Sequence, residues 1–342
     1  ISCCEDLYKN VMREDGYMIS TLMKMSGARK AVQLLGGVEK DMEVLILHDP
    51  LTAANVEPLA IAANEVGARV TTMQMTPSKF HGKQLSPVIG EAMKAADLVI
   101  GLTYQNIAHT QARLDAQVRG TKVMVLPESD SDSFFLASGW DANFPALRAE
   151  IDALASAFTK AEQARVWSKD GTDITMSVAG REGRSLNGFV NTKDISSGYC
   201  LESSLAPVEG TAEGRVVVNA SIPGVALIEK EFVEIVFEKG LAISIEGGPE
   251  AVKFRNLLAN FNDPNVYNLG ELGIGMNPEC ILDGTMLSDE SVYGGFQLAL
   301  GTSAYIGGTC KAAAHYDTVI INACLELDGK KIFENDRLLI PF

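Results

Sequence analysis

Histidine is scarce in this chain: 342 residues include only His48, His81, His109 and His315. There are six cysteines, but none forms a C-x-x-C pair, which argues against zinc-ribbon and thioredoxin-like folds. No apolar run approaches the roughly 18 residues that a membrane-spanning helix needs. A metal site that uses histidine therefore has few possible positions.

Positive charge is also in short supply, because 29 Lys and Arg face 44 Asp and Glu, for a formal net charge of −15. This balance argues against nucleic acid and against anionic membrane surfaces as partners. The first residues, ISCCEDLYKNVMREDG, lack the charged-then-apolar pattern of a secretory signal. We therefore expect a cytoplasmic protein with reduced thiols. Its expected partners are a small-molecule substrate and further copies of itself, as a homo-oligomer.

Strand-like and helix-like segments alternate in the first half of the chain. MEVLILHDP, RVTTMQM, DLVIGLT and TKVMVLP are short and largely apolar, and segments such as TAANVEPLAIAANEVGA between them have helical spacing. This alternation is typical of a parallel sheet covered on both faces. We predict an α/β, Rossmann-like domain over residues 1–164, with further helices within residues 5–36 and 146–164.

The second half is β-rich, with Gly and Asp-Gly turns between segments such as FVEIVFEKGLAISIEGG and TVIINACLELDGKKIF. The triplet EKG and the sequence LDGK predict hairpin turns. One helix is expected in GPEAVKFRNLLANFND, beginning at Pro249. We predict a largely antiparallel, β-rich α+β domain over residues 165–342, and we expect it to carry a metal site.

Two stretches of this second half contain residues that could bind a metal. In AAAHYDTVI, His315 and Asp317 would point to the same face of a strand. Such a pair can bind a metal, share a proton or satisfy each other. In VYNLGELGIGMNP, Glu271 lies among glycines and apolar residues. It is either an exposed loop residue or a buried carboxylate that needs a partner.

Taken together, FNDPNVYNLGELGIGMNP, GGTCKAAAHYDTVI and LDGKKI resemble the dihydroxypyridine ring-opening dioxygenases, as does AADLVIGLTYQNIAHTQARLDAQVRGTKVMVLPE in the first half. These are non-haem iron enzymes, related in fold to the aminopeptidase T/S metallopeptidases. The resemblance implies that His315 and Asp317 hold one divalent metal ion, and that Glu271 occupies the position of the family's other histidine ligand. It also implies that His109 acts as a catalytic acid or base near the substrate.

Glu271 is the main departure from the dioxygenase pattern. The aminopeptidase relatives have a glutamate there, in a motif like Gly270-Glu271, but they bind two metals with further ligands. Gln297 stands where they have a histidine, and NASIPGVAL lacks the carboxylate of their corresponding segment. The remaining set is one histidine and two carboxylates, which suits Fe(II), Mn(II) or Zn(II). Fe(II) is the ion that the resemblance favours.

Three functions are compatible with these residues. The favoured one is a metal-dependent dioxygenase that opens a small hydroxylated N-heterocycle, with Tyr104 and Ser303 as substrate contacts. The second is a metal-dependent hydrolase of an amide, cyclic amide or peptide, which Glu271 favours. The third is a binding protein without catalytic activity. His48 is expected to be structural, and His81 to lie in a surface loop.

Overall fold

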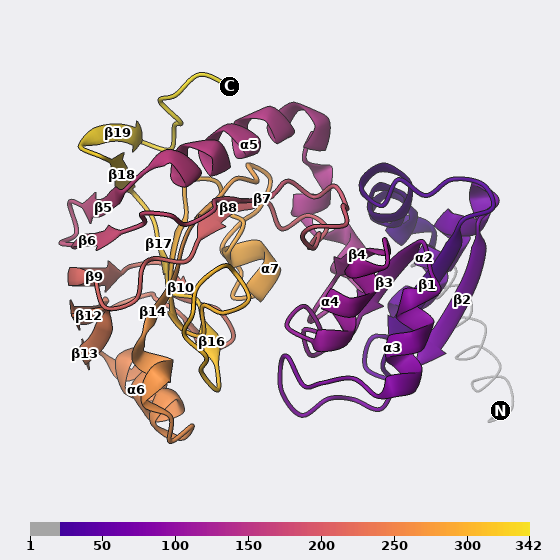
Figure 1. Ribbon diagram of the computed structural model, residues 1–342, viewed down its shortest axis with the longest axis horizontal. Helices are drawn as coiled ribbons and strands as arrows, with labels where there is room; N and C mark the ends of the chain where they lie inside the picture. Colours follow the sequence, from indigo (N-terminus) through magenta and orange to yellow (C-terminus); the bar gives the residue numbers. More distant parts are fainter. Residues whose placement is uncertain (1–20) are drawn as a thin grey trace, which may run out of the picture. The chain divides into compact units, whose positions relative to one another are not determined.

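The computed structural model describes residues 21–342, which divide into two units of packing (Figure 1). The first unit runs to Asp141 and includes Phe189–Gly198, whereas the second contains Ala142–Gly188 and Tyr199–Phe342. This division differs from the expected boundary after residue 164. The reason is that helix α5 (Phe144–Lys160) packs on strands of the second unit. The part of the expected first helix before residue 21 lies outside the described residues.

A four-stranded parallel sheet forms the centre of the first unit, in the order β2-β1-β3-β4. The predicted parallel sheet with helices is therefore confirmed. Its strands are β1 (Glu43–His48), β2 (Arg69–Gln74), β3 (Leu98–Leu102) and β4 (Lys122–Val125). Its helices and helical turns are residues 21–29, continued by the π-helical η1 (Lys30–Leu35), then η2 (Ala53–Asn55), α2 (Val56–Glu65), α3 (Pro87–Lys94), α4 (Gln111–Val118), η3 (Phe134–Leu136) and η4 (Ser138–Asp141).

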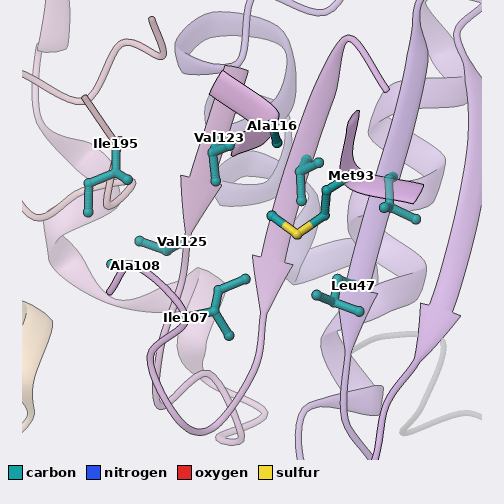
Figure 2. Packing of buried hydrophobic residues seen from close by; sticks show 10 residues of the cluster. Leu47, Met93, Ile107, Ala108, Ala116, Val123, Val125 and Ile195 are labelled. Carbon is teal, nitrogen blue, oxygen red and sulfur yellow. The ribbon is translucent and has the colours of Figure 1, made fainter. Parts of the chain in front are cut away.

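Strands β1, β3 and β4 are almost entirely buried, as their apolar sequences predict, whereas the edge strand β2 is exposed or half-buried along its length. On one face, side chains of β1, β3 and β4 pack with α3 and α4 in a cluster that includes Leu47, Met93, Ala116 and Val123 (Figure 2). On the other face, Leu98 reaches Gly36 at the end of η1, where an added Cβ would lie 3.1 Å from the leucine side chain. Apolar burial on both faces is what holds the short strands together.

Two antiparallel sheets form the second unit, which confirms the expected β-rich half. The eight-stranded sheet has the order β11-β10-β17-β15-β14-β8-β7, with β16 also paired to β15. Its strands are β7 (Arg184–Leu186), β8 (Glu202–Leu205), β10 (Ser221–Ile222), β11 (Ala226–Leu227), β14 (Leu269–Gly275), β15 (Phe296–Gly301), β16 (His315–Tyr316) and β17 (Val319–Ile320).

The seven-stranded sheet has the order β13-β12-β9-β6-β5-β18-β19. Its strands are β5 (Gln163–Ser168), β6 (Asp173–Ser177), β9 (Glu213–Val218), β12 (Val233–Glu238), β13 (Leu241–Glu246), β18 (Ala323–Leu327) and β19 (Lys330–Phe333). Both predicted hairpins belong to this sheet. Lys239-Gly240 joins β12 to β13 with φ of 48° and 77°, and Asp328-Gly329 joins β18 to β19 with φ of 48° and 76°. Two successive positive φ angles are typical of the type I′ turn, which matches the twist of a hairpin.

Helices cover parts of both sheets in the second unit. Helix α5 packs on β7 and β8, and helix α6 (Pro249–Ala259) packs on β12 and β13. The shorter helical segments are η5 (Pro264–Tyr267) and α7 (Met286–Asp289). Within residues 21–342, no helix combines the length and the apolar character needed to cross a bilayer.

The packing of α5 on the second unit leads to a stability prediction. Phe158 is fully buried, and the chain at Gly183 passes so close to α5 that an added Cβ would lie 2.8 Å from the Phe158 Cβ. We expect Phe158→Ala to lower the free energy of unfolding by about 3–5 kcal/mol, because it opens a cavity in a tight interface. Urea denaturation measures this loss, with the exposed Lys160→Ala as the matched control on the same helix. Equal stability of the two variants would contradict the assignment of α5 to this core.

Candidate metal centre

One face of the eight-stranded sheet carries the candidate ligands. Glu271 lies opposite Ala299, and Gly273 lies opposite both Ser204 and Gln297. Because side chains alternate along a strand, these residues share one face of the sheet. Every residue of β14 is buried, so Glu271 is a buried carboxylate and not an exposed loop residue. Gly273 and Gly275 let neighbouring groups approach this face closely, because a Cβ there would lie 2.6 Å from Gln297 Oε1 or collide with the Val292 carbonyl oxygen.

The HYD sequence lies at the same face, as strand alternation predicts. His315 pairs with Gly301 in β16, and Val319 pairs with Gln297 in β17, so the register is continuous across both short strands. His315 and Asp317 therefore point to the face that carries Glu271. Tyr316 points the other way, and its ring centroid lies 6.1 Å from those of Phe254 and Phe261.

Glu271, His315 and Asp317 form a compact group, whose ligand atoms all lie within 4.8 Å of one another. The Nε2 atom of His315 is 3.1 Å from Glu271 Oε2 and 3.7 Å from Asp317 Oδ2. On the other side of the ring, Nδ1–H donates to the carbonyl oxygen of Thr302 at 2.9 Å. That hydrogen bond fixes the orientation of the ring and leaves Nε2 facing the two carboxylates.

Two further glutamates, which the sequence reasoning missed, lie close to this group. Glu202 and Glu290, together with Cys200, form the second of two groups within residues 21–342 whose ligand atoms could hold an ion. Burial and the nearby charge of Glu271 raise the pKa of Glu202 to about 8. Burial and the nearby Asp317 also raise the pKa of Glu290 far above its ordinary value. Burial and the neighbouring carboxylates therefore favour the protonated form of both glutamates.

The electrostatics of the three candidate ligands follow from their mutual contacts. Burial disfavours a charged imidazole, but Asp317 and Glu271 outweigh it and raise the pKa of His315 to about 9. Burial would raise the pKa of Glu271, yet the hydrogen bond and charge of His315 lower it. The pKa of Asp317 is raised, chiefly by burial. The two carboxylates thus favour the positively charged form of the imidazole that lies between them.

These residues fit a divalent metal ion. One imidazole nitrogen and two carboxylates converge on a common point, and this mixed set of nitrogen and oxygen donors suits Fe(II), Mn(II) and Zn(II). The carbonyl of Thr302 provides the outer hydrogen bond that metal-binding histidines commonly make. A divalent ion would also offset the negative charge that Glu271 and Asp317 bring into a buried site.

Ser303 directly follows Thr302, and its hydroxyl is engaged by residues outside the candidate ligand group. Ser303 is fully buried, and its hydroxyl donates to Glu209 Oε1 at 2.6 Å. The Ser303 Oγ atom also accepts the N–H of Cys310 at 3.1 Å. The hydroxyl therefore holds a loop together in this structure. Contact of Ser303 with a substrate stays a prediction that this arrangement does not favour.

Tyr104 and His109 belong to the first unit, in the loop that follows β3. Strand order reverses between β1 and β3, and ligands in such sheets bind beyond the strand ends at this reversal. Asp49, after β1, ties the two loops together, because its carboxylate accepts the N–H groups of Leu51 and Tyr104, both at 2.9 Å. His48 is buried and donates from Nδ1 to the Asp49 carbonyl at 3.2 Å, in line with a structural role.

The position of His109 is set by neighbouring polar side chains. It directly precedes Thr110, whose hydroxyl caps α4 by accepting the N–H of Arg113 at 3.3 Å. Gln84 donates to the His109 carbonyl at 3.4 Å, and His81 accepts the N–H of Asn106 at 3.0 Å. His81 is exposed, as expected of a surface loop, yet it braces the loop that carries His109. The catalytic role of His109 stays a prediction.

The chain is similar in sequence to proteins of one known family. The model of the NicX family, 2,5-dihydroxypyridine 5,6-dioxygenase, matches residues 24–340. The chain belongs to this family. A curated 2,5-dihydroxypyridine 5,6-dioxygenase of Pseudomonas putida (strain KT2440) is 25% identical over 267 residues, which cover 73% of each chain. The family resemblance drawn from the sequence motifs is thus confirmed.

Solved structures extend the likeness of this NicX family member to the fold. The 2,5-dihydroxypyridine dioxygenase from Pseudomonas putida KT2440 has a TM-score of 0.81 at 22% identity, covering 93% of this chain and 97% of that one. AmpT from Thermus thermophilus has a TM-score of 0.61 at 16% identity, covering 93% and 99%. At these identities the structures show a shared fold, and the chemistry must be argued from the residues.

Proposed function

We propose that this member of the NicX family is a ring-cleaving dioxygenase, which opens a small hydroxylated N-heterocycle with the aid of one Fe(II) ion. The observation that carries the proposal is the buried group of Glu271, His315 and Asp317 on one sheet face, in a chain that matches the family over residues 24–340. By its relatives' name, 2,5-dihydroxypyridine is the first substrate to test.

Each of the three residues has a defined part in holding the ion. His315 would bind through Nε2, because its Nδ1–H is engaged by the carbonyl of Thr302. Glu271 and Asp317 would bind through carboxylate oxygens and offset the charge of the ion. When bound, Fe(II) would supply open coordination positions for substrate and O2. The buried face that carries these ligands would keep bulk water away from the reacting ring.

His109 is the residue that we propose moves a proton in this reaction. An imidazole with a pKa near neutrality can take a proton from a ring hydroxyl and return it to the product. The support comes from its place beyond a strand end at the reversal of a parallel sheet, and from the family resemblance. Tyr104, in the same loop, is proposed as a substrate contact.

A hydrolase is the rival function, and Glu271 is the observation that favours it. The aminopeptidase relatives have a glutamate at this position, and a carboxylate in place of a histidine does not change the number of open coordination positions. A hydrolase would need only a Lewis acid, so it would accept Zn(II) or Mn(II) and would not consume O2. Membership of a dioxygenase family favours the oxygenase.

The proposed ligand set leads to a prediction about metal content. Loss of a residue that only hydrogen-bonds to a ligand costs about 10–100-fold in metal affinity. We expect His315→Ala and Asp317→Asn, which remove a ligand itself, to lower Fe(II) affinity by at least that factor. Metal analysis of protein loaded with Fe(II) without oxygen measures this change. Glu246→Gln is the matched control. Glu246 is an exposed carboxylate of the same unit, it pairs with Arg255, and it is not one of the candidate ligands. Unchanged iron content in His315→Ala would contradict the ligand assignment.

The reaction class can be tested by oxygen use. With 2,5-dihydroxypyridine or related hydroxylated heterocycles, we expect turnover to require O2 and Fe(II), because ring cleavage by a dioxygenase inserts both oxygen atoms. Mass spectrometry after reaction under labelled O2 should find both labelled atoms in the product. Equal turnover with and without oxygen, or full activity with Zn(II), would instead establish the hydrolase.

The role of His109 gives a separate prediction. His109→Ala should bind Fe(II) like the parent protein and lose about 10²–10⁴-fold in kcat, which is the usual contribution of a general acid or base. The loss should be accompanied by disappearance of one limb of the pH–rate profile. Full activity of a folded His109→Ala protein would leave His109 with a structural role only.

A further inference from the structure

The loop between β15 and β16, residues 302–314, contacts the imidazole of His315 at Nδ1, the ring nitrogen that does not face the two carboxylates. Its first residue, Thr302, supplies the carbonyl that accepts Nδ1–H at 2.9 Å, and its backbone N–H donates to the Ala314 carbonyl at 2.9 Å. The position of this carbonyl therefore decides where Nε2 points. The loop has little regular structure, so other contacts must fix it.

Cys310 is the centre of the contacts within this loop. Its carbonyl accepts three hydrogen bonds at 3.0 Å, from the hydroxyl of Thr302 and from the N–H groups of Ser303 and Ala304. Its own N–H donates to Ser303 Oγ and to Glu209 Oε1, both at 3.1 Å. Any shift of the Cys310 peptide would therefore displace Thr302 and the carbonyl that holds His315.

Glu209, which lies far from this loop in the sequence, joins the loop to the rest of the second unit. Its Oε1 atom accepts the Ser303 hydroxyl and the Thr309 N–H, each at 2.6 Å, in addition to the Cys310 N–H. Its Oε2 atom pairs with the guanidinium of Arg181, which also donates to the Gly307 carbonyl at 2.6 Å. One carboxylate thus engages the loop at three points and is itself paired with a cation.

The geometry around Gly308 shows how closely the loop is fitted to this carboxylate. A Cβ at Gly308 would collide with the Ser303 hydroxyl and lie 2.7 Å from Glu209 Oε1. Burial opposes ionisation of Glu209, but the hydrogen bonds from Ser303, Thr309 and Cys310 outweigh it and lower its pKa to about 2. The carboxylate is therefore ionised at neutral pH, and its hydrogen bonds to the loop are charge-assisted.

We propose that Glu209 is a positioning residue for the metal centre. By fixing the Cys310 peptide and the Ser303 hydroxyl, it holds the Thr302 carbonyl in place and so aims Nε2 of His315 at the ion. Glu209 itself would not touch metal or substrate. The proposal rests on the proposed role of His315 as a metal ligand, and it assigns to the Arg181–Glu209 pair a function in ligand geometry.

The test is a Co(II) titration of metal-free protein, followed by the visible absorption of the bound ion, for the parent, Glu209→Gln and Glu209→Asp. In Glu209→Gln, the neutral amide weakens the contacts to the loop and turns an NH2 group toward Arg181. We expect its Co(II) Kd to rise about 10–100-fold, as for other outer-shell partners, with an altered absorption band. Glu209→Asp keeps the charge and should recover part of the affinity.

Asp173→Asn is the matched control, because Asp173 makes a two-point ion pair with Arg165 in the same unit but has no contact with the loop. It should leave the Kd and the spectrum unchanged. A folded Glu209→Gln protein with the parent's Kd and spectrum would overturn the proposal. If Glu209→Gln does not fold, Ser303→Ala decides in its place, since it removes the hydrogen bonds of the Ser303 hydroxyl to Glu209 and from Cys310 but keeps the Arg181–Glu209 pair, and it should shift the Kd in the same direction.

His315→Ala separates this proposal from the one on which it rests. If the parent binds Co(II) no more tightly than His315→Ala does, the ligand assignment itself fails. If His315→Ala loses binding while Glu209→Gln and Ser303→Ala keep it, the ligand assignment stands and the positioning role of Glu209 is excluded.

Discussion

Negative charge buried on one face of the eight-stranded sheet is the constraint on which the candidate centre depends. Glu202, Glu271, Glu290 and Asp317 come from separate segments of the chain, and all are at least partly withdrawn from water. Burying an uncompensated carboxylate costs several kcal/mol, so the fold must neutralise this group. The raised pKa values of His315, Glu202 and Glu290 all act to reduce this negative charge, and the nearby charge of Arg184 also favours the carboxylates. A divalent cation could replace part of that compensation, which gives metal binding and folding a common electrostatic cause.

Glycines let neighbouring segments pack closely around this charged group. A Cβ at Gly273 would lie 2.6 Å from Gln297 Oε1, and one at Gly301 would collide with the Ala314 carbonyl beside His315. Gly301 also has φ of +117°, a conformation that other residues rarely adopt. These glycines thus let neighbouring segments approach closely beside the candidate ligands. Apolar strand residues such as Leu272 and Leu298, which are fully buried, anchor the sheet beneath these ligands.

Local patterns in the sequence were enough to predict most elements of the fold. The apolar strands of the first unit, the helix at Pro249 and the turns at Lys239-Gly240 and Asp328-Gly329 all follow from periodicity or turn chemistry. The shared face of His315 and Asp317 also follows from alternation. Glu202 could not be found in this way, because alternation gives the face of a strand but not its neighbours in the sheet. Glu290, at the end of α7, and Glu209, in a turn, lie outside the strands, and the loop partners of Glu209 lie about a hundred residues further along the chain.

Because the fold resembles both a dioxygenase and AmpT, the reaction must be inferred from the candidate ligands and from the residues that position them. The fold is compatible with either relative, so it cannot select between oxygen insertion and hydrolysis. A carboxylate at Glu271 adds charge that strengthens the hold on a cation, but it lacks the fixed direction of an imidazole nitrogen. Directional control of the ion then depends more heavily on His315, the one nitrogen donor of the group. The Thr302 carbonyl, and the loop contacts that fix it, consequently matter more to this centre than they would in a site with two histidines.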